Sequence, residues 1–156
     1  MKAFVSNKTE TSSGGRILNP KPYFALFKTY VQLTRPLGLI LIGFATIIGQ
    51  IVALKRLPEP SMFVFPLLAS ALATASSFVI NDYLDADIDS INKPKRPIPS
   101  GVISRKSAFR FGIALFLAGF LVSLATNFIA VCVLMVTYWL SIFYSVFAKK
   151  QVFSET

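Results

Sequence analysis

Four carboxylates lie close together in the stretch NDYLDADIDS, and they are all the aspartates of the chain. We expect the helix formed by the preceding apolar run to continue through this stretch. On such a helix, one arc of about 100° carries one amide and three carboxylates, and Asp87 points to the other side. These four residues are Asn81, Asp82, Asp85 and Asp89. Carboxylates this close repel one another and are costly beside lipid, which favours a divalent cation among them over a solvated acidic loop. Hard oxygen ligands suit Mg²⁺, so we predict a metal site formed by Asp82, Asp85 and Asp89.

A calcium loop is a competing interpretation of the same stretch. Asp85, Asp87 and Asp89 alternate as at the start of an EF-hand. The next position is Ser90 where the sharp turn needs glycine, and the twelfth is Arg96 where the loop needs glutamate. The spacing therefore argues against an EF-hand.

A basic, proline-rich segment follows the carboxylates. Its cations are Lys93, Lys95, Arg96, Arg105 and Lys106. Arginine and lysine side chains bind phosphate, and the prolines of KPKRPIP prevent one continuous helix. Carboxylates with Mg²⁺ and adjacent cations form a pyrophosphate site. Its position beside apolar sequence implies a pyrophosphate that is carried on a lipid tail.

The composition excludes several classes of protein. The chain is 54% hydrophobic with a mean hydropathy of +0.62, too apolar for a soluble domain. It has no histidine and one cysteine, which excludes Ser-His-Asp and Cys-His catalysis, a disulfide framework and a zinc cluster. The net charge of +9 comes from lysines and arginines that flank apolar runs, so we expect no nucleic-acid binding.

Three charge-free runs predict an all-α, polytopic transmembrane helical bundle. Residues 36–54 and 60–81 each fit one span, and 111–148 fits two with a turn near 126–127. The four predicted helices are 36–55, 62–82, 107–125 and 128–148. Small residues from Ala69 to Ser77 predict a helix-packing interface.

The basic residues predict the topology. They gather before the first span, between the second and third, and after the fourth, and four spans place these segments on one side. By the positive-inside rule this side is cytoplasmic. We therefore expect an integral membrane protein of the cell (plasma) membrane. A flexible cytoplasmic tail would cover 1–28 and a partial transmembrane domain 29–156.

These motifs resemble those of the UbiA superfamily of intramembrane prenyltransferases over residues of about 30 to 150. The family's N-D-x-x-D-x-x-x-D motif matches NDYLDADID. INKPKRPIPSGVIS is similar to its R-P-[IL]-P-S-G segment, and YSVFAKK to its Y-x-x-x-K region with one extra residue. Within the family, the sequence looks most like the archaeal geranylgeranyltransferases of ether-lipid synthesis, and next like the chlorophyll synthases. Quinone, haem and tocopherol prenyltransferases also remain open.

The resemblance implies a mechanism and a set of residues. Mg²⁺ neutralises the diphosphate of a prenyl donor, the C–O bond breaks to give an allylic cation, and a lipid or aromatic acceptor attacks C1. The implied partners are therefore a prenyl diphosphate, such an acceptor and membrane lipids. Catalytic roles fall on Asp82, Asp85, Asp89, Tyr144 and Lys149. Substrate binding falls on Asn81, Lys93, Arg96 and Arg105.

One departure from the family concerns its second half. Family members have about nine helices and a second motif, D-x-x-x-D, whereas this chain has four predicted helices and only Glu155 as an acid after Asp89. We expect the first half of such a fold, with a C-terminal half as a further partner, and weak donor binding with little or no turnover by the isolated chain. An inactive half-domain or membrane scaffold is the alternative. A transporter would need charges inside the spans, and the four predicted helix cores have none.

Overall fold

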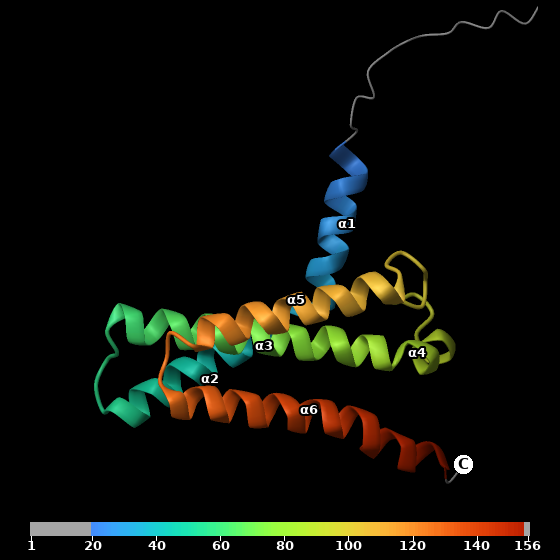
Figure 1. Ribbon diagram of the computed structural model, residues 1–156. Helices are drawn as coiled ribbons and strands as arrows, with labels where there is room; N and C mark the ends of the chain where they lie inside the picture. Colours follow the sequence, from blue (N-terminus) through green and yellow to red (C-terminus); the bar gives the residue numbers. More distant parts are fainter. Residues whose placement is uncertain (1–19, 155–156) are drawn as a thin grey trace, which may run out of the picture.

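The structure, a computed structural model, describes residues 20–154, with side chains over 24–147. Within this range the chain forms six helices and no strands (Figure 1). They are α1 (Pro20–Leu33), α2 (Pro36–Leu54), α3 (Pro60–Leu84), α4 (Ala86–Asn92), α5 (Arg105–Ser123) and α6 (Phe128–Ser154). The predicted all-α class is confirmed.

Four of these helices are long and apolar enough to cross a membrane. The candidate spans are Pro36–Leu54, Pro60–Leu84, Arg105–Ser123 and Phe128–Phe147. Their ends agree with the predicted helices to within two residues, and the turn between the last two lies at 124–127 as expected. Large apolar side chains such as Leu37 and Leu121 are 72% and 65% exposed on them. Surfaces of this kind are stable in lipid, and the chain is an integral membrane protein.

Helix α3 lies at the centre of the bundle and packs against α2, α5 and α6 (Figure 1). The Ser76 hydroxyl joins three helices, because it donates to the Gly112 carbonyl of α5 over 2.8 Å and pairs with the Tyr138 hydroxyl of α6 at 2.9 Å. Helices α2 and α5 run antiparallel to α3, and α6 runs parallel to it (Figure 1). The starts of α2 and α5 therefore lie at the same end of the bundle as the ends of α3 and α6.

The run of small residues on α3 forms the predicted packing interface. Ala69, Ala73, Ala75 and Ser76 are buried, and Gly119 of α5 faces the first two. Small side chains let the two backbones approach closely, which favours helix association in lipid through van der Waals packing.

Two helices differ from the sequence-based expectation. Residues 20–28, which were expected in the flexible tail, form the first part of α1, while residues 1–19 lie outside the described range. The helix expected to run through the acidic stretch is interrupted at Asp85, which ends α3 and precedes α4. Aspartate favours helix ends over helix interiors, because its short side chain competes for backbone hydrogen bonds.

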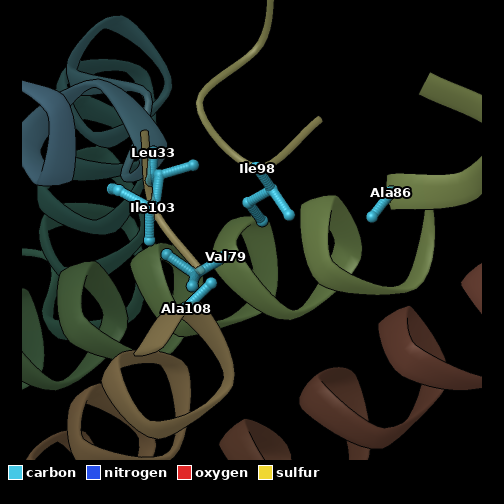
Figure 2. Packing of buried hydrophobic residues seen from close by; sticks show 6 residues of the cluster. All are labelled: Leu33, Val79, Ala86, Ile98, Ile103 and Ala108. Carbon is cyan, nitrogen blue, oxygen red and sulfur yellow. The ribbon is translucent and has the colours of Figure 1, made fainter. Parts of the chain in front are cut away.

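The loop of residues 93–104 is packed onto the bundle by two isoleucines. Ile98 and Ile103 are 6% and 2% exposed and belong to one cluster with Leu33, Val79 and Ala108 (Figure 2). The Ile103 amide donates to the Pro97 carbonyl over 3.0 Å, and Gly101 takes the left-handed conformation with φ +78° that the turn between them requires. The loop is therefore an ordered support for the basic side chains that it carries.

Ile103→Ala is expected to destabilise this loop by about 2–4 kcal/mol, because it removes buried methyl groups and leaves a cavity against Leu33 and Val79. Thermal unfolding in detergent and the rate of tryptic cleavage after Lys95 would measure the effect. Val102→Ala is the matched control, since the Val102 side chain is 57% exposed in the same loop. Equal effects of the two substitutions would contradict the anchoring role of Ile103.

Candidate functional site

Asp82 and Asp89 are the two buried carboxylates of the acidic stretch, with 7% and 6% of their surfaces exposed. Asp82 lies in the last turn of α3, and Asp89 lies in the middle of α4. A buried carboxylate is unfavourable unless it is paired or hydrogen-bonded. The partners of these two groups therefore define the site.

One guanidinium joins the two carboxylates. Arg96 Nη1 donates to Asp82 Oδ1 over 3.4 Å and also donates to Asp89 Oδ2. The loop positions Arg96, because its amide donates to the Lys93 carbonyl over 3.0 Å and its carbonyl accepts from the Ser100 amide over 2.9 Å. Since the same nitrogen atom reaches both carboxylates, Asp82 and Asp89 face one common point.

A second guanidinium, that of Arg35, reaches the same carboxylate from the start of α2. Arg35 Nη2 donates to Asp82 Oδ1 over 2.5 Å, and its Cζ lies 5.1 Å from the centroid of the Phe78 ring. Its backbone has φ 51° and ψ 72°, a left-handed conformation that residues other than glycine rarely adopt. From the sequence, Arg35 was only one of the basic residues before the first span that predict the topology. Its position directly before Pro36, at the start of a charge-free run, is the signal that could have marked it.

An open pocket of about 610 Å³ lies between the end of α1 and the basic loop. Its charged lining residues are Arg35, Asp82, Lys93, Lys95 and Arg96. The lining contains four cations and one carboxylate, so the pocket carries an excess of positive charge. Such a lining suits an anion with several oxygen atoms, because guanidinium groups bind phosphate oxygens in pairs and ammonium groups bind them as point charges.

Asp87 and Arg105 form a separate pair on the outside of the bundle. Arg105 donates to both carboxylate oxygens of Asp87, over 2.8 and 3.1 Å, and Asp87 has a side chain that is 80% exposed. Asp87 thus lies apart from Asp82 and Asp89, as the helical spacing predicted. The structure does not bring Arg105 to these carboxylates, and its role as a substrate contact stays a prediction.

The predicted set of three metal ligands is not gathered in this structure. The described part of the chain contains no group of three acidic or cysteine side chains that could hold a metal ion together. Asp82 and Asp89 nevertheless face one cation, the Arg96 guanidinium, and carboxylate oxygens arranged in this way also fit Mg²⁺. Two ligands would come from these residues, and the others from Asp85, water or a substrate phosphate. Asp85 and Asn81 are half-buried at the end of α3.

Two predicted site residues lie on α6. Tyr144 is 67% exposed, and one turn before it the Ser141 hydroxyl pairs with the Ser77 hydroxyl of α3 at 2.6 Å. Because α3 and α6 run parallel, Tyr144 is level with the end of α3, where the acidic stretch begins. Lys149 belongs to α6, but its side chain lies outside the described residues, and its role stays a prediction.

Comparison with known proteins connects this arrangement to a family. The model of the UbiA prenyltransferase family matches residues 42–156. The chain is 40% identical over 101 residues to digeranylgeranylglyceryl phosphate synthase of Thermococcus kodakarensis, a match that covers 65% of this chain and 36% of the relative. It is 38% identical over 126 residues to the synthase of the same name from Saccharolobus solfataricus, which covers 81% of this chain and 45% of the relative.

A solved structure shares the fold. This structure was described in a study of digeranylgeranylglyceryl phosphate synthase in membranes. It superposes on the present chain with a TM-score of 0.77, and the two sequences are 30% identical. The match covers 81% of this chain and 45% of the other. The chain thus spans less than half the length of each of the relatives described here.

Proposed function

Because the chain belongs to the UbiA prenyltransferase family, we propose that it forms the diphosphate-binding part of an intramembrane prenyltransferase. One observation carries the proposal: Asp82 and Asp89 face a common cation beside a pocket with excess positive charge. The similar synthases favour geranylgeranyl diphosphate as the donor and geranylgeranylglyceryl phosphate as the acceptor, in the synthesis of ether lipids. Chlorophyll-type and quinone-type acceptors are the alternatives.

The residues of the pocket act first on the diphosphate of the donor. Lys93, Lys95 and Arg35 bind its oxygen atoms, while Asp82 and Asp89, together with Asp85, would hold Mg²⁺. Bound there, the metal would neutralise the leaving diphosphate as a Lewis acid. Arg96 then leaves the point between the two carboxylates and turns to a diphosphate oxygen. With Mg²⁺ held by Asp82 and Asp89, neither buried carboxylate would be left unpaired when Arg96 turns away, an unpaired state that would be strongly destabilising.

The reaction then follows from the chemistry of an allylic diphosphate. The C1–O bond of the donor breaks, and its electron pair stays with the diphosphate. The acceptor oxygen bonds to the cationic C1 and passes its proton to the released diphosphate. We assign Tyr144 to the stabilisation of this cation by its ring, and Lys149 to a phosphate contact. The apolar spans shelter the prenyl tail.

The same proposal includes an orientation in the plasma membrane. The starts of α2 and α5 and the ends of α3 and α6 lie at one end of the bundle, next to the basic segments (Figure 1). An excess of lysine and arginine beside the spans supports a cytoplasmic position for this end. The acidic and basic motifs would then face the cytoplasm.

Removal of the divalent cation is expected to abolish donor binding. The chain in liposomes would be titrated with geranylgeranyl diphosphate in Mg²⁺ and in EDTA, and product would be measured with geranylgeranylglyceryl phosphate, chlorophyllide and a quinone-precursor aromatic acid. We expect Mg²⁺-dependent binding that EDTA reverses. Without the metal, the negative diphosphate of the donor would lie beside the negative carboxylate of Asp82, and the two charges would repel each other. Ca²⁺ at the same concentration is the control for simple charge screening.

Each result separates the alternatives. Transfer to one acceptor would support the enzyme and identify its substrate. Mg²⁺-dependent binding without transfer would support a donor site that needs further helices for turnover. If the folded chain neither binds the donor nor transfers it, the proposal fails and the scaffold interpretation takes its place.

A further inference from the structure

Helix α1 has an apolar side that no other described part of the chain covers. Phe24, Phe27 and Val31 are 71%, 65% and 38% exposed. Their spacing of three and four residues places them on one side of the helix. Lys28 and Gln32, which are also exposed and lie one turn apart, form a polar edge beside them. Helix α1 is therefore amphipathic, with an apolar side and a polar edge that both lie outside its contact with the bundle.

The opposite side of α1 fixes the helix to the bundle at a defined level. The Tyr30 ring meets the Phe111 ring edge-on at 5.0 Å, and Leu33 is buried against Val79 and Ala108. Phe111 begins a charge-free run, and Val79 lies just before the end of another at residue 81. These contacts thus place α1 where the spans leave the apolar part of the membrane. In Figure 1, α1 extends sideways from the bundle and not along it.

The connection to α2 prevents α1 from leaving this level. Only Thr34 and Arg35 separate the two helices, and Leu33 just before them is 1% exposed. A helix held at the boundary of the membrane and directed across the spans lies in the plane of the interface. Its exposed phenylalanines would be solvated poorly by water but well by the acyl chains just below the headgroups.

We propose that α1 is an interfacial helix that lies in the cytoplasmic surface of the membrane, with Phe24, Phe27 and Val31 in the lipid. The partner is a phospholipid surface, and its anionic headgroups are complementary to Lys28 and to the cations of the pocket beside it. Further transmembrane helices would run parallel to the spans and would contact the exposed sides of α2 and α6. Because α1 runs across that direction, we expect lipid and not such helices on its apolar side. Gln32 and Leu33 also line the pocket, so the same placement opens it at the level of the headgroups.

Spin labels on the full chain test this placement directly. In a Cys132→Ala background, single cysteines would replace Phe24, Phe27 and Val31 on the apolar side, and Lys28 and Gln32 on the polar edge. The chain would be placed in vesicles of phosphatidylcholine and phosphatidylglycerol. Accessibility to oxygen and to a water-soluble nickel chelate would then be compared. Phe44→Cys on α2 gives the lipid reference and Val102→Cys in the loop gives the water reference, because both side chains are well exposed.

We expect the ratio of oxygen to nickel accessibility at 24, 27 and 31 to be several-fold higher than at 28 and 32. We expect this difference because the apolar side of an interfacial helix lies about 5–10 Å into the boundary between headgroups and acyl chains. Ratios at 24 and 27 equal to that at Val102→Cys would mean that α1 lies in water. Immobile labels protected from both reagents would mean that protein covers this side. Either result would overturn the proposal, and neither depends on prenyl transfer.

Discussion

Asp82→Asn is expected to lower Mg²⁺-dependent prenyl transfer on the order of 10²-fold or more. The asparagine has the same shape and can still accept a hydrogen bond from Arg35 or Arg96. It removes the negative charge that both guanidinium groups neutralise and that the metal would need. The loss should appear in kcat together with a higher Mg²⁺ requirement, measured at several metal concentrations. If the chain binds the donor without turnover, the quantity to compare between the variants is the dissociation constant of the donor instead of kcat.

Asp87→Asn is the matched control for this prediction. It makes the same change two residues after the break at Asp85, but its side chain is 80% exposed and pairs only with the guanidinium of Arg105 among the salt bridges of the described residues. We expect transfer within roughly twofold of the unmodified chain, as is usual for surface positions. Equal losses for both variants would show that the acidic stretch acts through its overall charge, and would contradict a specific site at Asp82 and Asp89.

Gly119→Leu is expected to destabilise the bundle by about 1–3 kcal/mol or more. A Cβ atom at Gly119 would lie 3.1 Å from the Ala73 amide nitrogen, 3.1 Å from the Leu72 Cβ and 3.3 Å from the Ala69 carbonyl oxygen. Backbone atoms cannot rotate away, so α3 and α5 would have to separate along their closest contact. The thermal midpoint in detergent should fall by several degrees, with a matching loss of donor binding.

Gly49→Leu provides the control for Gly119→Leu. Gly49 also lies inside a span, but an added Cβ atom meets nothing within 4 Å there. We expect its thermal midpoint to stay close to that of the unmodified chain. A similar fall for both variants would mean that leucine in any span disturbs the fold, and the close approach of α3 and α5 would not explain the result.

The spans were predictable because the bilayer imposes a simple physical rule. A backbone in hydrocarbon must satisfy its own hydrogen bonds, so charge-free runs of sufficient length become helices. The loop between α5 and α6 followed from length alone. The face shared by Asp82 and Asp89 also followed from helical spacing, since the interruption at Asp85 changes the register little: the Asp89 amide still donates to the Asp85 carbonyl over 2.8 Å.

Other features depended on contacts that a sequence does not show. Arg35 lies 47 positions before Asp82, and only the packing of α2 on α3 brings them together. Helix α1 was missed because lysine and polar residues in the tail conceal its apolar side, which is recognisable only once Tyr30 and Leu33 are known to face the bundle. The Arg96 bridge depends on how Ile98 and Ile103 fold the loop back, which spacing alone does not define.

The position of α2 has a consequence for how the protein is made. No residue of α2 is buried, and it packs mainly against α3, as in the hydrogen bond between Thr46 and Ser70 at 3.1 Å. During synthesis α2 emerges before α3, so it must remain in the bilayer for a time without the helix that holds it. Its charge-free sequence allows this, because lipid can solvate every side of it. The insertion of α2 into the bilayer and its packing against α3 are then two separate events.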